Sequence, residues 1–222
     1  MLVARGISLV IGYICGLFLT GFVIGKIENV DLTTQGSGNV GTTNTLRILG
    51  VPKGALTLLG DMLKGVVAAF IVYFVFRNTS YGQTGIALLM EYACFGAVLG
   101  HDFPFYMLKK GGKGIATSAA LVLVCFPKAL PLLVLAFIAI VFFTRYVSLG
   151  SISIAALLSV EVIVFAQLGY LDYYNEYKWE AVVIVVLATL LAIFKHKSNI
   201  GRLLKGCENK FSFHPNTKKQ ED

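Results

Sequence analysis

Three polar segments of this 222-residue chain combine glycines with basic or hydroxyl side chains in spacings that suit phosphate. The first reads GSGNVGTTNTLRILG and covers residues 36–50. Its three glycines within six residues allow successive backbone N–H groups to converge on an anion. A helical continuation would bring Thr43, Asn44 and Arg47 to one face. Hydroxyl, amide and guanidinium groups would then border a phosphate-sized cradle. The structural alternative is a glycine-rich turn before a capped helix.

The second segment, residues 100–118, reads GHDFPFYMLKKGGKGIATS and sets a lysine among glycines ahead of an expected helix. Lys113 and the preceding backbone would suit an anion at that helix N-terminus. A Walker A loop is excluded, because that motif needs Gly at position 107, where Met stands, and Ser or Thr at position 114, where Gly stands. On spacing alone, His101 is more readily explained as a structural histidine than as a functional one.

The third segment, HKSNIGRLLKGCE at residues 196–208, follows the last apolar stretch of the chain. In a helix, His196, Asn199 and Arg202 recur at steps of three and could face inward together. The apolar residues between them would form a strip in the membrane interface. The alternative is a basic juxtamembrane helix that binds only lipid headgroups.

Long apolar stretches separate these segments. The chain is 56% hydrophobic and 14% charged, with a mean hydropathy of +0.76, whereas soluble domains carry about 25% charged residues. A helix of roughly 20 apolar residues crosses the hydrocarbon core. The sequence therefore predicts an all-α polytopic membrane protein with about seven transmembrane helices, in a single membrane-embedded domain over 1–222 with a flexible cytoplasmic tail from 209. The expected helices cover 7–25, 54–76, 84–100, 114–126, 129–143, 151–170 and 179–195.

Two features leave alternatives to this topology. The fourth and fifth helices are short for full spans and are divided by Pro127, so five spans with a broken hairpin are the main structural alternative. The N-terminal apolar run resembles a signal peptide, but it continues to Gly25 without a small-residue cleavage site. We therefore interpret it as the first span.

The distribution of basic residues predicts the orientation. Seven spans place fourteen lysines and arginines on one side and four on the other. By the positive-inside rule, the N-terminus is then outside and the C-terminus cytoplasmic, with all three polar segments on the cytoplasmic side. The fourteen are Lys26, Arg47, Lys53, Lys109, Lys110, Lys113, Arg145, Lys195, Lys197, Arg202, Lys205, Lys210, Lys218 and Lys219, and the four are Arg5, Arg77, Lys128 and Lys178.

Charges within the expected spans call for partners. Asp61 and Lys64 are three residues apart in the second helix and can pair, whereas Glu91 and Glu161 are lone acids. A charge near the bilayer centre costs about 2.5–3.5 kcal/mol on insertion scales, so we expect each acid to face protein or water. The net charge of +7 is explained by orientation and by anionic lipid or substrate rather than by nucleic acid. The four cysteines show no disulfide or metal-ligand spacing.

Taken together, the motifs resemble the bacterial membrane acyl-phosphate:glycerol-3-phosphate acyltransferases, the PlsY family, over about residues 16–208. The family signature GSGNxGxTNxxRxxG is matched at every fixed position of the first segment, and DMLKG, GHDFP, GGKGIAT and RYVSLGSI follow in order. The departures are Thr42, where alanine is common, Leu108, often basic, and the uncharged residues 33–35. They leave the motif positions intact.

The resemblance implies acyl transfer from acyl phosphate to the 1-hydroxyl of sn-glycerol 3-phosphate, which yields 1-acyl-glycerol 3-phosphate and phosphate at the first step of phospholipid biosynthesis. It implies no metal and no other cofactor, membrane lipids as surroundings, a monomer, and an active site on the cytoplasmic side of the bacterial cell membrane. The positions carried over are catalytic at Ser37, Arg47, Lys113, His101, His196 and Asn199. They are substrate-binding at Gly36, Gly38, Asn39, Gly41, Thr43, Asn44, Gly111, Gly112, Gly114, Thr117, Arg145, Ser148, Ser151 and Arg202, and structural at Asp61, Lys64 and Glu208.

Other functions fit the sequence less well. A transporter of a phosphorylated solute would explain the basic loops and the intramembrane charges, but it predicts binding groups at the midplane and usually repeated halves. Here the polar motifs gather at one face and no repeat is visible. A lipid-binding scaffold would leave the three glycine, lysine and arginine cradles without a purpose. Acyltransferases of the H-x-x-x-x-D type are excluded, since no histidine is followed by aspartate five residues later.

Overall fold

The computed structural model describes residues 1–107 and 111–211, and within these ranges the regular structure is entirely helical. Lys109, Lys110 and most of the predicted tail lie outside the described residues. The helices are α1 Leu2–Gly16, α2 Thr20–Ile27, α3 Thr42–Leu49, α4 Val51–Phe76, α5 Gly82–Asp102, α6 Ile115–Cys125, α7 Leu130–Thr144, α8 Val147–Gln167, α9 Lys178–Lys195 and α10 Lys197–Leu204, with 3-10 turns η1 Phe105–Met107, η2 Pro127–Ala129 and η3 Asp172–Tyr177.

Six helical segments in the described part of the chain are long and apolar enough to cross a membrane. They are Leu2–Ile27, Val51–Phe76, Gly82–Met107, Pro127–Thr144, Val147–Gln167 and Tyr174–Lys195. The remaining apolar helix, α6, has 11 residues. The predicted all-α membrane fold is confirmed, and the count of seven full spans stays a prediction.

The first span is not the continuous helix over 7–25 that its hydropathy predicts. It is broken at residues 17–19, where Leu19 takes an extended conformation (φ −94°, ψ 98°). The polar backbone at the break is bound by other helices: Lys64 Nζ donates to Phe18 O at 2.9 Å, and Thr20 N donates to Asp61 Oδ1 at 3.3 Å. Irregular backbone at membrane depth is tolerated where protein groups satisfy it, so the break depends on contacts that the apolar pattern does not contain.

Close approach of α1 and α5 forms the centre of the bundle. Gly12 and Gly16 on α1 face Gly96 and Gly100 on α5, and a Cβ at any of them would overlap the backbone of the opposite helix. Small residues four apart allow this packing between membrane helices. Helices α4, α6 and α9 also pack on α5, which makes α5 the scaffold from which the polar loop at its C-terminal end is positioned.

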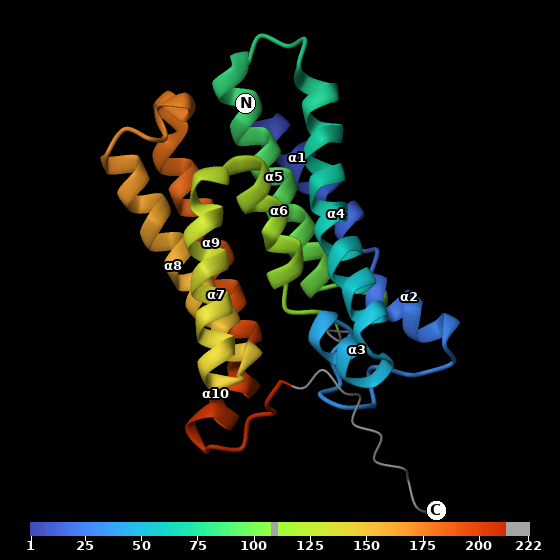
Figure 1. Cartoon of the computed structure of the whole chain (residues 1–222). Coiled ribbons are helices and arrows are strands. Elements are labelled where there is room, and N and C mark those ends of the chain that lie inside the picture. The colour runs from blue at the N-terminus through green and yellow to red at the C-terminus, as the bar shows by residue number, and fades with distance from the viewer. Residues whose placement is uncertain (108–110, 212–222) are drawn as a thin grey trace, which may run out of the picture.

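The three polar segments lie toward the same end of the molecule (Figure 1). Helices α3 and α10 are at the lower end, together with the start of α6, whereas the α4–α5 connection is at the upper end. At the far end from the polar segments, Arg5 of α1 donates to both carboxylate oxygens of Glu180 on α9, at 2.5 and 2.6 Å, and Tyr92 of α5 donates to the same carboxylate at 2.8 Å. This ion pair joins three helices of the bundle.

Candidate active site

Asn44 organises the first segment. Its side chain is buried at the start of α3, and its Oδ1 accepts from the backbone N–H of Ser37 at 2.8 Å and from Arg47 Nη1 at 3.3 Å. Its Nδ2 donates to Gln35 O at 3.0 Å and to Leu32 O at 3.2 Å. The predicted common face of Asn44 and Arg47 is confirmed. One buried amide thereby folds the glycine loop back onto the helix that carries the guanidinium.

The glycines of this loop are required by its backbone. Gly36 and Gly38 have φ angles of +61° and +69°, in the left-handed region that favours glycine. A Cβ at Gly36 would overlap Asn44 Oδ1. Between them, Ser37 is exposed to solvent. Asn39 then accepts from Gly41 N at 2.9 Å and donates to Gly111 O at 3.4 Å, so the first loop touches the second.

The second glycine loop lies directly on the C-terminal end of α5. Gly112 N donates to His101 O at 3.0 Å, and a Cβ at Gly112 would overlap His101 Nε2. A Cβ at Gly111 would meet the carbonyl oxygens of His101 and Asp102 at 2.5 Å. Gly114 has φ +72° and precedes the first residue of α6. Glycine is therefore needed at each of these positions for the loop to approach α5.

His101 belongs to a buried polar cluster beneath this loop. Lys64 Nζ lies 2.6 Å from His101 Nδ1 and 3.0 Å from Asp61 Oδ1. An ammonium group can only donate, so Nδ1 is the acceptor, and the proton of the neutral ring is assigned to Nε2 below Gly112. The predicted Asp61–Lys64 pair is confirmed. This pair holds the His101 ring in place beneath the loop. His101 therefore positions the loop and is not itself exposed to substrate.

The third segment closes on the second through a chain of polar contacts. Lys113 Nζ donates to Asn199 Oδ1 at 2.5 Å, and Asn199 Nδ2 donates to Glu208 Oε1 at 3.0 Å. Arg202 Nε donates to the other oxygen of Glu208 at 2.8 Å. Asn199 and Glu208 are both buried. Lys113 and Asn199 are 86 residues apart in sequence, so this contact is made by the fold alone.

The electrostatics of this cluster favour an anion. Burial lowers the pKa of Lys113 to about 8, and the charge of Arg202 adds to the shift. Burial likewise lowers the pKa of Arg47, with Glu208 opposing the change and Arg202 reinforcing it. Three cationic side chains thus lie within electrostatic range of one another around the carboxylate of Glu208. Such mutually repelling, partly desolvated cations are stabilised by a bound phosphate.

His196 is held at the junction of α9 and α10. Its ring is buried, and Nδ1 lies 2.7 Å from Ala192 O, which assigns the proton to Nδ1 and leaves Nε2 as an acceptor. Burial lowers the pKa of His196 to about 4, with the charge of Lys113 contributing. The ring is therefore neutral at pH 7 and suited to accept a hydrogen bond from a hydroxyl group.

Other predicted site residues lie apart from these contacts or make no hydrogen bond to them. Arg145 is exposed and donates to Phe211 O at 3.1 Å. Thr117 is buried where α6 packs against Gly65 of α4. Because α8 begins at Val147 rather than at 151, Ser148 and Ser151 lie in its first turns and are buried. Thr43 is half-buried on α3.

Two residues at this end were missed by the sequence analysis. Asp102 is fully buried, and neither of its carboxylate oxygens has a hydrogen-bond partner in the described part of the chain. Lys195 Nζ donates to the backbone oxygen of Asp102 at 2.7 Å. The available signal was weak: a carboxyl group next to His101 at the end of an apolar stretch, and a lysine next to His196 that was attributed to orientation.

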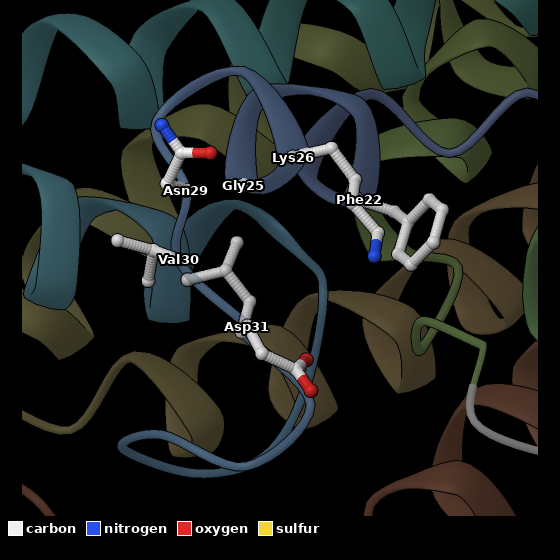
Figure 2. A pocket seen from close by; sticks show the side chains of 7 residues that line it. Phe22, Gly25, Lys26, Asn29, Val30 and Asp31 are labelled. Carbon is white, nitrogen blue, oxygen red and sulfur yellow. The ribbon is translucent and has the colours of Figure 1, made fainter.

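A pocket of about 240 Å³ lies elsewhere, between the end of α2 and the chain that follows it. Figure 2 shows Phe22, Lys26, Asn29, Val30 and Asp31 around it. Lys26 Nζ is 5.6 Å from the centre of the Phe22 ring, and Asp31 Oδ1 accepts from Thr33. The residues that line this pocket are not those of the three polar segments, so its volume does not mark the chemistry.

Comparisons with known proteins match nearly the whole chain to one family. The profile of the family described as glycerol-3-phosphate acyltransferase matches residues 6–206. A glycerol-3-phosphate acyltransferase of Syntrophomonas wolfei is 39% identical over 206 residues, covering 92% of this chain and 95% of the relative. One of Shouchella clausii is 37% identical over 212 residues, covering 95% of this chain and 97% of the relative.

Two solved structures resemble the fold closely. They are crystal structures of PlsY, an integral membrane glycerol 3-phosphate acyltransferase, in a glycerol 3-phosphate form and a lysophosphatidic acid form. Their TM-scores are 0.78 and 0.76, at 32% and 31% identity, and each comparison covers 94% of this chain and 96% of the other. This chain belongs to the glycerol-3-phosphate acyltransferase family and is a membrane acyltransferase.

Proposed function

We propose that this enzyme transfers an acyl group from acyl phosphate to the 1-hydroxyl of sn-glycerol 3-phosphate and releases lysophosphatidate and inorganic phosphate. The observation that carries the proposal is the cluster of Arg47, Lys113 and Arg202 around Asn199 and Glu208 at one end of an apolar bundle. Both substrates are phosphate esters or anhydrides, and the donor carries an acyl chain that apolar helices accommodate. The ligand forms named for the two PlsY structures support the acceptor and the product class.

This reaction requires the enzyme to position the two substrates more than to activate them, because acyl phosphate already carries a leaving group. The hydroxyl oxygen forms a bond to the acyl carbonyl carbon, the bond from that carbon to the phosphate oxygen breaks, and phosphate leaves with the electron pair. The hydroxyl proton passes to a phosphate oxygen of the substrate, so no dedicated base or cofactor is required. Lys113, Arg47 and loop N–H groups stabilise the charge on the phosphates and on the carbonyl oxygen. His196 Nε2 accepts from the neighbouring 2-hydroxyl of glycerol 3-phosphate and so orients the 1-hydroxyl, whose proton stays available to the phosphate.

Direct transfer follows from the surroundings of Ser37. A serine nucleophile needs a neighbouring base, but no hydrogen bond joins Ser37 to His101 or His196 in the described part of the chain. His101 Nδ1 is held by Lys64, and His196 Nε2 is taken by a glycerol hydroxyl in this proposal. Ser37 instead donates a hydrogen bond to phosphate or to the carbonyl oxygen. Incubation with radiolabelled acyl phosphate alone, followed by denaturation and lipid removal, should leave no label on the protein. A stoichiometric acyl adduct that glycerol 3-phosphate chases into product would contradict direct transfer.

The site faces the cytoplasm in this proposal, in the cell membrane of a bacterium, within a single monomeric membrane domain. The basic residues that gather at the site end of the bundle support this orientation. Membrane lipids surround the apolar helix faces, and the soluble phosphates arrive from the cytoplasmic side.

The decisive experiment uses purified protein in detergent or proteoliposomes. Labelled glycerol 3-phosphate is supplied with acyl phosphate or, in parallel, with acyl-CoA, and lysophosphatidate is measured. We expect product with acyl phosphate and none with acyl-CoA, and an Arg47→Ala variant serves as the impaired control. Turnover with acyl-CoA alone would overturn the donor, and no lysophosphatidate with either donor from folded protein would overturn the proposed function.

A further inference from the structure

The site is assembled from two groups of helices. His196, Asn199 and Arg202 come from the end of α9 and from α10, whereas Lys113 comes from the glycine loop between α5 and α6. The direct side-chain bond between these groups is that of Lys113 to Asn199. In the proposed function Lys113 also binds a phosphate, so its ammonium group is shared between Asn199 and the substrate, and this bond alone does not fix the two groups during the reaction. Another contact must then keep the two groups in register.

Lys195 makes such a contact at the last residue of α9. Its Nζ donates to Asp102 O at 2.7 Å, at the C-terminal end of α5. The same ammonium lies 4.6 Å from the centre of the Phe103 ring. A half-buried ammonium that has both a carbonyl acceptor and an aromatic face is fixed in position more firmly than an exposed one. Lys195 thus links α9 to the point where α5 passes into the loop.

Asp102 carries this link on to the glycine loop. A Cβ added at Gly114 would lie 3.1 and 3.3 Å from the two side-chain oxygens of Asp102. A Cβ added at Gly111 would lie 2.5 Å from the backbone oxygen of Asp102. Asp102 therefore contacts the loop on both sides of Lys113.

These contacts close a ring. The loop rests on Asp102, Asp102 accepts from Lys195, and Lys195 is followed after one residue by α10, whose Asn199 accepts from Lys113 of the loop. Opening the Lys113–Asn199 bond breaks one side of the ring. The side formed by Lys195, Asp102 and Phe103 remains, and it is made of groups that the proposed reaction does not use.

We propose that Lys195 is a positioning residue for acyl transfer, which through Asp102 and Phe103 holds α10 against the glycine loop so that Asn199, His196 and Lys113 face the same substrate. This inference rests on the proposed function for its kinetic consequence, but the clasp itself is a property of the fold. The alternative is that Lys195 only adds to the basic charge of the cytoplasmic side.

Lys197 provides a matched control for that alternative. It is an exposed lysine two residues along the chain, and its Nζ lies 5.1 Å from the centre of the Phe194 ring at the end of α9, not against α5. Substituting it removes the same charge from the same end of the molecule but leaves the link between α9 and α5 intact. An effect of charge alone would therefore appear equally in both variants.

The experiment compares Lys195→Met, Lys195→Arg and Lys197→Met with the parent enzyme. Lys195→Met should lower kcat by between about ten- and a hundredfold, the range expected when reacting groups shift by about 1 Å. Lys195→Arg should recover most of this loss, because a guanidinium can still donate to Asp102 O and lie over Phe103. Lys197→Met should retain the parent kcat. Equal kcat in Lys195→Met and the parent, or equal losses in Lys195→Met and Lys197→Met, would overturn the proposal.

Amide hydrogen exchange tests the clasp without the reaction. Lys195→Met should speed exchange in α10 and in residues 111–114 relative to the parent and to Lys197→Met, with α4 unchanged. Unchanged exchange in those segments overturns the inference whatever the activity, whereas faster exchange in an enzyme that turns over neither donor overturns only the proposed function. If Lys195→Met does not fold, Phe103→Leu, at a partly exposed ring, should show the same changes in weaker form, and its failure to do so counts equally against the clasp.

Discussion

Among the individual side chains, Arg47 carries a positive charge that is partly withdrawn from solvent beside Glu208 and Arg202. Arg47→Ala should lower kcat/KM at least tenfold, since a charge-assisted hydrogen bond contributes on the order of 1.5–3 kcal/mol. Arg47→Lys should recover only part, because the two-pronged geometry is lost. The measurement is initial rate at equal membrane abundance. The control is Arg77→Ala, because Arg77 is exposed at the C-terminal end of α4, away from the site. Full activity of Arg47→Ala would mean that Arg47 serves only to orient the protein in the membrane.

Lys113 gives the site a pH dependence with a defined sign. Burial lowers its pKa to about 8, so the ammonium group that we propose binds phosphate is present below that pH and is lost above it. The second ionisation of a phosphate ester, near pH 6, is complete in this range. The kcat/KM for glycerol 3-phosphate, which reports the free enzyme, should therefore fall as pH rises through about 8.

Lys113→Arg separates this effect from general alkaline inactivation. A guanidinium stays charged throughout the range, so the alkaline decline should move beyond pH 10 even if the absolute rate is lower. A decline at the same pH in both enzymes would show that a different group titrates.

Local spacing predicted some of these residues and could not predict others. Asn44 and Arg47, and likewise Asp61 and Lys64, are three residues apart, and helical geometry alone brings them together. The bonds of Lys64 to His101 and of Lys113 to Asn199 join residues 37 and 86 apart. No periodicity encodes such distances. The role of Asp102 was not predicted, because it depends on the backbone oxygen that accepts from Lys195 and on the burial of the residue. Neither property leaves a pattern in the sequence.

At the scale of the helices, the length of the apolar stretches predicted where helices form, but it did not predict where a helix is broken. The expected ranges for α4, α5, α6, α7 and α9 agree with the structure to within a few residues at either end. The break between α1 and α2 was not foreseen, because residues on both sides of it are apolar and the groups that satisfy its backbone come from α4 and η1. Tyr106 of η1 donates to Leu17 O at 2.5 Å, for example. Tertiary hydrogen bonds here override a continuous helical propensity.

The contact between α5 and the second glycine loop leads to a prediction about the element as a unit. Gly112→Ala places a methyl group on His101 Nε2, and the ring cannot retreat because Lys64 holds its other nitrogen. We expect the loop to lift from α5 and carry Lys113 with it, which raises KM for glycerol 3-phosphate at least tenfold. Gly201→Ala, in α10 where an added Cβ meets nothing within 4 Å, should leave KM unchanged.

A second substitution tests this cause. His101→Ala removes the ring that the new methyl group would strike, so the double variant should show a lower KM than Gly112→Ala alone. Equal KM values in the single and double variants would mean that the collision with His101 is not what displaces the loop.

Across the whole molecule, the two ends of the bundle are built differently. The end that bears the three segments contains glycine loops, short helices and clustered cations, whereas the opposite end is tied by Arg5, Glu180 and Tyr92. Buried acids lie between them, and Glu91 and Glu161 both face protein as expected. The polarity of this architecture was evident in the sequence from the basic residues, but its orientation in a membrane depends on the positive-inside rule.

Cys207 allows the orientation to be measured. It is exposed just beyond α10, whereas Cys94 and Cys125 are buried and Cys15 is half-buried in the first span. An impermeant thiol reagent should leave Cys207 unlabelled in intact cells and label it in inverted membrane vesicles, because the positive-inside rule predicts that the side with fourteen basic residues is cytoplasmic. Asn78→Cys in a Cys207→Ser background, at the exposed α4–α5 connection, should show the reverse pattern. Labelling of Cys207 from outside intact cells, with Asn78→Cys protected, would invert the topology and place the whole site on the outer face, out of reach of cytoplasmic glycerol 3-phosphate.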